Sequence, residues 1–135
     1  MTRVALPAPQ AAHIRALAQA AIPDECCGLL EGLRDGGDFR VTALHPARNR
    51  AASSDRFEID PADHFAARRV ARARGHVIIG CYHSHPGGQA QPSAVDLAGA
   101  GEDNFLWLIA SNEDLAAFVY LRGVFTGADW VTSSE

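Results

Sequence analysis

Two histidines one residue apart, followed by an aspartate, are the residues of this chain best suited to hold a metal ion. His83 and His85 follow the apolar run 77–79. Alternate residues of an extended strand point to the same face, so the two imidazoles are expected side by side at a strand end. Asp96 lies beyond a connector that holds prolines and glycines, and it can fold back as a third ligand. Two imidazoles and one carboxylate leave a fourth tetrahedral position open, which is typical of a catalytic zinc site.

Each half of this pattern also has a purely structural explanation. Pro92 and Ser93 form a good helix start, with Ser93 as the N-cap and Asp96 at the third helical position. Histidines at a strand end are often polar edge residues without a ligand. The two interpretations are compatible, because a cap would hold Asp96 in a first helical turn that faces the histidines.

The spacing of these residues resembles the signature of the JAMM (MPN-domain) metalloproteases. His83-Ser84-His85-Pro86 is followed by Ser93 and Asp96 as in that family. The family also has a glutamate far upstream, before a Cys-Gly pair, and Glu25 stands at the matching position. The resemblance implies one Zn²⁺ held by His83, His85 and Asp96. It also implies that Glu25 is the general base and acid, and that Ser93 donates a hydrogen bond to the oxyanion.

The chemistry of this residue set is hydrolysis. Zinc in such a site can lower the pKa of water from 15.7 to roughly 7. Glu25 would take a proton from that water and deliver it to the leaving amine. Because Glu25 precedes the apolar run 28–30, partial burial is expected to raise its pKa.

The resemblance also implies a fold and a substrate class. It predicts the MPN architecture, which is similar to that of the cytidine deaminases, in one JAMM/MPN domain over residues 1–135. JAMM enzymes cleave the amide or isopeptide bond after the C-terminal Gly-Gly of ubiquitin or ubiquitin-like proteins, and some short prokaryotic members act on β-grasp sulfur-carrier proteins. An extended diglycine tail has no side chains, so it can enter a narrow cleft beside a sheet edge.

Composition excludes several other classes of function. The formal net charge is −4, so no overall positive field recruits nucleic acid or an anionic membrane. No apolar run approaches the roughly 20 residues of a membrane span. The N-terminus is too short and too polar for a secretory signal. Three cysteines give no disulfide framework, and the cytoplasm is the expected compartment.

Hydrophobic periodicity and turn signals predict an α/β fold, with a single mixed β-sheet flanked by helices. Helices are expected over 9–21, 61–74 and from Ser93. Strands are expected over 26–33, 39–44, 57–59, 76–83, 105–110 and 116–121, and 124–131 is expected to be a short strand or an irregular tail. Tight turns are expected at 35–38 and 111–114.

Other reactive residues have simpler interpretations. Cys81 shares a strand face with His83 and is a conceivable sulfur ligand, but burial in the core is favoured. Cys26 and Cys27 could suggest a cysteine peptidase, although adjacent cysteines in an apolar strand usually pack. A basic cluster on the second helix fits a solvated face, with a docking surface for an acidic partner as the alternative; it comprises Arg68, Arg69, Arg72 and Arg74. The remaining histidines are expected on the surface or in loops, namely His13, His45, His64 and His76.

Three other classes of protein share parts of this pattern. A noncatalytic MPN scaffold would bind partners only, but such members typically lose metal ligands that are all present here. A RadC-type protein has the same histidine loop, yet it carries a further N-terminal region and its association with DNA repair suits a less acidic chain. A zinc nucleoside deaminase needs H-x-E with P-C-x-x-C, and neither motif occurs.

Overall fold

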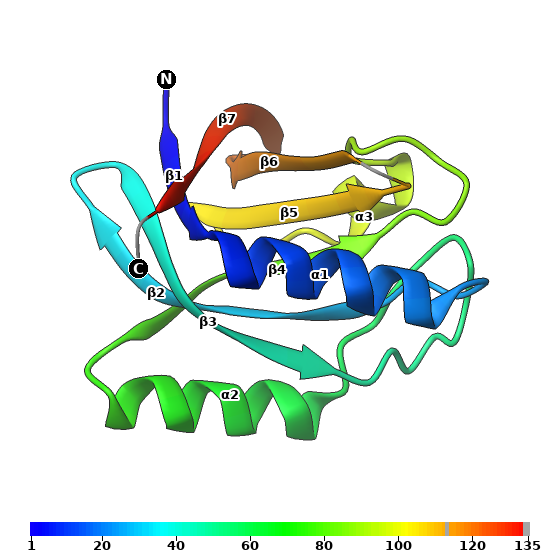
Figure 1. The fold of residues 1–135 in the computed structure, drawn as a ribbon, viewed down its shortest axis with the longest axis horizontal. Coiled ribbons are helices and arrows are strands. Elements are labelled where there is room, and N and C mark those ends of the chain that lie inside the picture. The colour runs from blue at the N-terminus through cyan, green and yellow to red at the C-terminus, as the bar shows by residue number, and fades with distance from the viewer. Residues whose placement is uncertain (113, 134–135) are drawn as a thin grey trace.

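Seven strands form one mixed sheet that closes into a barrel. The computed structural model describes residues 1–112 and 114–133. The strands lie in the order β1-β3-β2-β4-β5-β6-β7, and a parallel pairing between β1 and β7 closes the barrel (Figure 1). In chain order the elements are β1 (Arg3–Pro7), α1 (Ala8–Ala21), β2 (Cys27–Asp35), β3 (Asp38–Ala47), α2 (Pro61–Ala73), β4 (Val77–Ser84), α3 (Ala94–Gly99), β5 (Phe105–Ser111), β6 (Asp114–Leu121) and β7 (Val124–Ser133).

Two hydrophobic cores lie on the two sides of the central strands. Helix α1 buries Ala11 and Ile14 in the first core, against residues of β1, β3 and β5. Helix α2 buries Ala67 and Ala71 in the second core, against β2, β4 and β5. Figure 1 shows the two helices on opposite faces of these strands. Among the described residues, the helices are too short or too polar for any of them to span a membrane.

An irregularity in β4 decides which of its side chains face the α2 side. Leu30 pairs with Gly80 and Glu31 with Ile78, so Ile79 is an extra residue in the ladder between β2 and β4. As a result Ile78 and Cys81 pack in the same core, although an unbroken strand would point them to opposite faces. This shift leaves the alternation after Cys81 regular and directs His83 to the α2 side.

Glycine is required where β4 meets β5. A Cβ atom on Gly80 would lie 2.0 Å from the carbonyl oxygen of Leu106. This distance is a steric clash, so no residue with a side chain fits at this position. At this close approach β4 and β5 pair in a parallel register, in which Cys81 lies beside Trp107 and His83 lies beside Ile109. The end of β4 is therefore held against β5.

The expected mixed sheet with flanking helices is confirmed, but three details of the prediction were wrong. Strand β1 was not expected, because its apolar stretch is short and is followed by two prolines. It forms a strand because it pairs with β3 and β7, which lie far away in the sequence. Residues 57–59 form no strand, and Ile59 makes only an isolated bridge to Asn49. Residues 124–131 were expected to form a short strand or an irregular tail, but β7 is a long strand that closes the barrel by pairing with β1. Local sequence patterns do not reveal this pairing. The turn expected at 111–114 includes Glu113, which lies outside the described residues.

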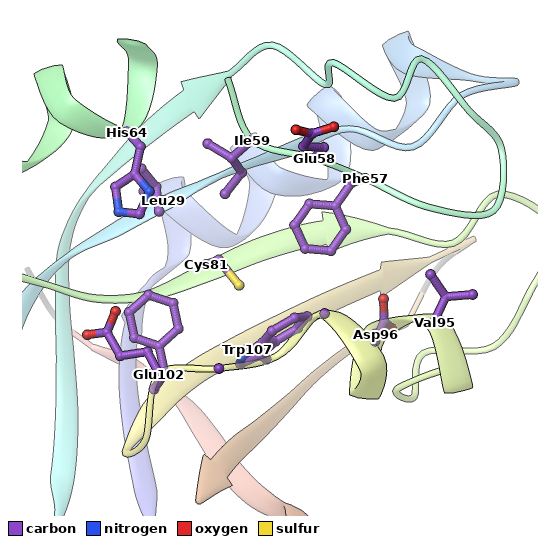
Figure 2. A pocket seen from close by; sticks show the side chains of 13 residues that line it. Leu29, Phe57, Glu58, Ile59, His64, Cys81, Val95, Asp96, Glu102 and Trp107 are labelled. Carbon is purple, nitrogen blue, oxygen red and sulfur yellow. The ribbon is translucent and has the colours of Figure 1, made fainter. Parts of the chain in front are cut away.

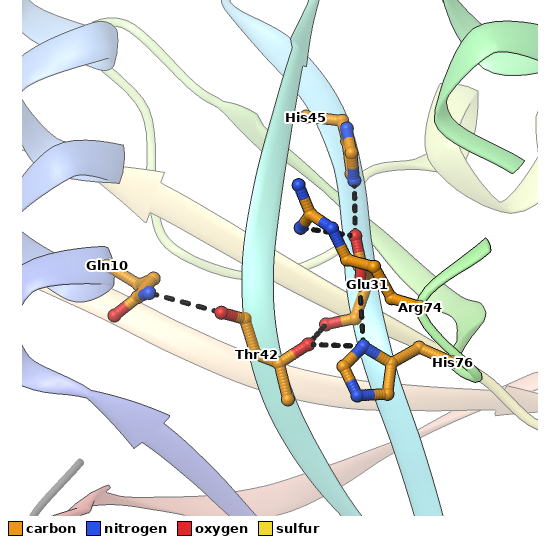
Figure 3. Close-up of polar contacts among 6 residues, drawn as sticks. All are labelled: Gln10, Glu31, Thr42, His45, Arg74 and His76. Atoms are coloured by element: carbon orange, nitrogen blue, oxygen red, sulfur yellow. Dashed lines mark hydrogen bonds and ion pairs between the residues drawn. The ribbon is translucent and has the colours of Figure 1, made fainter. Parts of the chain in front are cut away.

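A fully buried carboxylate joins four parts of the fold. Glu31 of β2 has no solvent exposure, and its Oε1 accepts hydrogen bonds from His45 Nε2 at 2.8 Å and Arg74 Nη1 at 3.2 Å. Its Oε2 accepts from His76 Nδ1 at 2.7 Å (Figure 3). The expectation of a surface or loop position is therefore wrong for His45, which lies half-buried in β3, whereas His76 does lie in the loop between α2 and β4. The contact of both histidines with Glu31 was missed because Glu31 lies far from them in the sequence.

We expect Glu31→Gln to lower the free energy of unfolding at pH 7 by about 1–3 kcal/mol, since an amide satisfies these donors poorly. Burial alone would raise the pKa of Glu31, but the hydrogen bonds from His76 and His45 and the charge of Arg74 hold it below its usual value. A lowered folded-state pKa gives stability that is lost as the pH falls through that pKa. Urea unfolding should thus show a difference between the two proteins that shrinks below about pH 4. Exposed Glu58→Gln is the control, and equal losses in both variants would contradict the prediction.

Candidate metal centre

Three of the side chains predicted to bind metal meet at one end of β4. The Nε2 atoms of His83 and His85 are 3.0 Å apart, and Asp96 Oδ2 lies 3.1 Å from each of them. Ligands at about 2.0–2.1 Å from a tetrahedral zinc ion are separated by about 3.3 Å. The three donor atoms therefore need to move apart by only a few tenths of an ångström to hold such an ion.

The two imidazoles are oriented by different neighbours. His85 Nδ1 donates to the carbonyl of Gln89 at 2.8 Å, which orients the ring so that Nε2 points toward His83 and Asp96. The ring of His83 is fully buried and stacks on Phe57, with ring centroids 4.3 Å apart. Trp107 packs edge-on against the same ring at 5.6 Å. Burial lowers the pKa of His83, so this imidazole is neutral, as metal binding requires.

Helix α3 fixes Asp96 through its cap. Ser93 Oγ accepts from the Asp96 N–H and Asp96 Oδ2 accepts from the Ser93 N–H, both at 3.0 Å, so the capping box predicted as one alternative is present. Burial would raise the pKa of Asp96, but the hydrogen bonds from His83 and His85 hold it well below its usual range. Asp96 is therefore an ionised carboxylate at neutral pH, suited to a cation.

Glu25 approaches the same histidines from the segment just before β2. One of its oxygens and one nitrogen of each imidazole lie within 4.8 Å of one another. The side chain is buried, and Oε1 has no hydrogen-bond partner among the described residues. Burial raises the pKa of Glu25 to about 7. Two carboxylates of different character thus face one pair of imidazoles, and the donors and the unsatisfied oxygen fit a divalent metal ion.

Comparison with known proteins shows the family to which this chain belongs. The family model for prokaryotic homologs of the JAB domain matches residues 7–121. The chain belongs to this family. The short prokaryotic JAMM/MPN type predicted from the sequence is confirmed by this match and by the relatives described next.

Several relatives of this JAB-domain chain carry names that describe an activity. A desampylase from Haloferax volcanii is 36% identical over 100 residues, which are 73% of this chain and 70% of the relative. A CysO-cysteine peptidase from Mycobacterium tuberculosis is 30% identical over 92 residues, which are 68% of this chain and 62% of the relative. The solution structure of a protein from Desulfitobacterium hafniense is 31% identical, with a TM-score of 0.88 over 100% of this chain and 94% of that one.

Two residues that the sequence analysis did not single out hold Glu25 in place. Asn49 Nδ2 donates to the Glu25 carbonyl at 3.1 Å, and Ser84 Oγ accepts from the Cys26 N–H at 2.9 Å. Ser84 stands between the two histidines, so its position in the JAB-domain signature could have indicated it. Asn49 lies in a polar loop, where no local pattern distinguishes it from its neighbours.

Cavities open on both sides of the metal centre, each with a volume of about 410 Å³. The first lies between the loop that carries Phe57 and the segment from α3 to β5, with Asp96 at one end (Figure 2). The second is lined by Glu25, His85 and Ser93. The candidate ligands thus separate a cavity on the Asp96 side from a cavity on the Glu25 side.

The cysteines and the basic cluster lie outside the donor set. Cys27 and Cys81 are buried, and burial raises the pKa of Cys27 to about 12, which opposes a thiolate nucleophile. Cys81 packs in the second core and also lines the first cavity. In the basic cluster, Arg68 donates to His64 and Glu102, and Arg74 to Glu31.

Proposed function

We propose that this chain is a zinc-dependent metallopeptidase that hydrolyses the amide bond after the C-terminal Gly-Gly of a ubiquitin-like or β-grasp sulfur-carrier protein. The observation that carries the proposal is the convergence of His83, His85 and Asp96, with Glu25 beside them. Membership in the JAB-domain family supports it, as do relatives named desampylase and CysO-cysteine peptidase. Three free cysteines suit the cytoplasmic location that we propose.

In this proposal His83, His85 and Asp96 hold Zn²⁺, and Glu25 moves the proton. Zinc, when bound, supplies a Lewis acid that activates water for attack on the carbonyl. Glu25 accepts the proton of that water and then delivers it to the leaving amine. Its unsatisfied buried Oε1 is suited to this exchange, because no other protein group among the described residues competes for it.

Ser93 can serve as cap and as oxyanion donor together. Its Oγ accepts from the Asp96 N–H through a lone pair, which leaves the hydroxyl hydrogen free to donate. Ser93 lines the cavity that also contains Glu25 and His85, so the hydroxyl borders the space where the carbonyl would react. The cap interpretation and the catalytic interpretation of Ser93 are therefore compatible.

A noncatalytic scaffold of the same fold is the second candidate, and the complete donor set speaks against it. Binding alone gives no reason to bury Glu25 without a partner, since an unsatisfied buried carboxylate reduces stability. The acidic net charge of −4 speaks against a RadC-type partnership with DNA.

The test is cleavage of a fusion protein in which a β-grasp ubiquitin-like protein from the same organism ends in Gly-Gly and continues into a reporter peptide. We expect the zinc-loaded enzyme to cut after the second glycine, and replacement of that glycine by phenylalanine to impair cleavage strongly. A variant with all three cysteines replaced by serine should stay active if it folds. Efficient hydrolysis of arbitrary unfolded peptides, or dependence on a thiol, would refute the proposal.

We also expect Asn49→Asp to slow cleavage by about 10- to 100-fold, because a small displacement of the catalytic group has a large effect on rate. The Asn49 amide donates to the carbonyls of Glu25 and Arg56, and an aspartate would place negative oxygens against both. Zinc content, measured by atomic emission, should not change. Exposed Asn104→Asp is the matched control. A loss of zinc in Asn49→Asp would show that Asn49 supports the ligands instead of Glu25.

A further inference from the structure

The cavity on the Asp96 side is a built apolar site that the metal centre alone does not need. Leu29 of β2 and Cys81 of β4 form its floor, and Phe57 and Trp107 stand on either side (Figure 2). The same two aromatic rings contact His83. The cavity therefore continues from the candidate metal centre, with Asp96 and the aromatic contacts to His83 as the link.

A buried donor in the wall of this cavity lacks a partner. Trp107 is 6% exposed, and its indole Nε1 has no acceptor among the described residues. A buried N–H without an acceptor reduces stability, so a ligand carbonyl that accepted this hydrogen bond would gain affinity. The backbone of an extended peptide supplies such carbonyls.

The position of Glu25 gives the direction of the substrate. A general acid must lie within hydrogen-bond reach of the leaving nitrogen. Glu25 lines the other cavity together with His85 and Ser93, so the leaving amine belongs on that side. The acyl half of the substrate then extends the opposite way, past Asp96 and into the cavity of Figure 2.

The charges at the edges of the cavity restrict what can enter. Glu58 and Glu102 both lie there and are exposed; among the described residues Glu58 has no ion-pair partner, while Glu102 pairs with Arg68 at 3.1 Å. These two carboxylates repel an acidic side chain, while the walls favour an apolar one. In an extended chain the residue before Gly-Gly lies about 7 Å from the last glycine.

We propose that this cavity binds the acyl half of the substrate and takes an apolar side chain from the residue that immediately precedes Gly-Gly. Trp107 Nε1 donates to a backbone carbonyl of the same tail. The inference rests on the proposed function and adds to it the direction of the substrate and the class of side chain that is selected.

Two glycines allow the cavity to be filled without disturbing the core. Gly99 and Gly101 line it, and a Cβ atom on either would meet no atom within 4 Å. Gly127 of β7 has the same open surroundings away from the cavity and is the matched control. The substrates are the fusion proteins described above, with leucine, alanine or aspartate before Gly-Gly, or with alanine or leucine as the first residue after it.

We expect kcat/KM to be at least about 10-fold higher for leucine than for aspartate before Gly-Gly. Gly101→Phe should bring the leucine-to-alanine ratio close to 1 and leave the dependence on the residue after Gly-Gly unchanged, whereas Gly127→Phe should change neither. If Gly101→Phe does not fold, Gly99→Leu replaces it. An unchanged leucine-to-alanine ratio, or a change confined to the residue after Gly-Gly, would overturn the proposal.

A binding measurement separates this inference from the proposed function. Acetyl-Leu-Gly-Gly with a free carboxylate should shift the indole N–H resonance of Trp107 in the zinc-loaded protein, and acetyl-Asp-Gly-Gly should do so only weakly. If no fusion is cleaved but this selective shift occurs, the proposed function fails and the cavity assignment stands. If cleavage occurs and neither peptide shifts the resonance, the cavity assignment fails alone.

Discussion

Replacing His83 or Asp96 by alanine should abolish both tight zinc binding and hydrolysis. Each donor atom lies about one ligand separation from the other two, so loss of one leaves two of the three proposed protein ligands in place. We expect the purified protein to contain one zinc per chain by atomic emission, and both variants to contain little or none. A chelator should inactivate the wild-type enzyme until zinc is restored.

His64→Ala is the control for this experiment. His64 is half-buried and bonded to Arg68, but it lies outside the donor set. Its removal should leave the zinc content unchanged. Full hydrolytic activity in a zinc-free preparation would contradict the metal assignment, whatever the variants do.

The donors near His83 and His85 allow two different ligand triads, and the zinc contents of the Asp96→Ala and Glu25→Gln variants distinguish them. Either Asp96 or Glu25 can complete the pair of imidazoles. Asp96 is favoured because its Oδ2 touches both Nε2 atoms and its pKa is held low, whereas the pKa of Glu25 is raised by burial. If Asp96→Ala keeps its zinc and Glu25→Gln loses it, the two roles must be exchanged.

The meeting of the candidate ligands could be predicted because short-range rules govern it. His83 and His85 follow from the two-residue period of a strand, and the structure places their Nε2 atoms together. Ser93 and Asp96 follow from the rules for a helix N-terminus, and the capping box is present. In each case the relevant geometry is set within a few residues of the chain.

The parts that were missed depend on contacts between distant segments. Strand β1 forms because β3 and β7 lie beside it, and the extra residue Ile79 in β4 is visible only in its pairing with β2. Glu31 accepts hydrogen bonds from His45 of β3 and from His76 of the loop before β4. Asn49 reaches Glu25 across 24 positions in the sequence. No periodicity or turn signal encodes such pairings.

Asp96 shows why a structural and a chemical interpretation of one residue need not compete. Its Oδ2 accepts from the Ser93 N–H and also faces both imidazoles. A carboxylate oxygen has more than one lone pair, so one contact does not exclude the other. The cap orders the side chain before any metal binds, which reduces the entropy that binding must overcome.

Glu25→Gln should keep the zinc and the fold but slow cleavage by about 10²- to 10⁴-fold, the usual effect of losing a general acid–base. The amide has nearly the shape of the carboxylate but cannot accept and return the proton. Zinc content and single-turnover cleavage of the Gly-Gly fusion protein are the measurements. Unchanged cleavage by a zinc-loaded Glu25→Gln protein would refute the assigned role.

The stability of the metal-free proteins gives an independent test of the environment of Glu25. Its folded-state pKa of about 7 lies above the unfolded value of about 4.3, so the folded protein retains a proton that the unfolded chain has lost. The wild-type protein should therefore lose stability relative to Glu25→Gln as the pH rises from about 4 to 7. Urea unfolding of both metal-free proteins across this range measures the difference. A constant difference would mean that Glu25 is ionised without resistance from its surroundings, and that burial does not prepare it to exchange a proton.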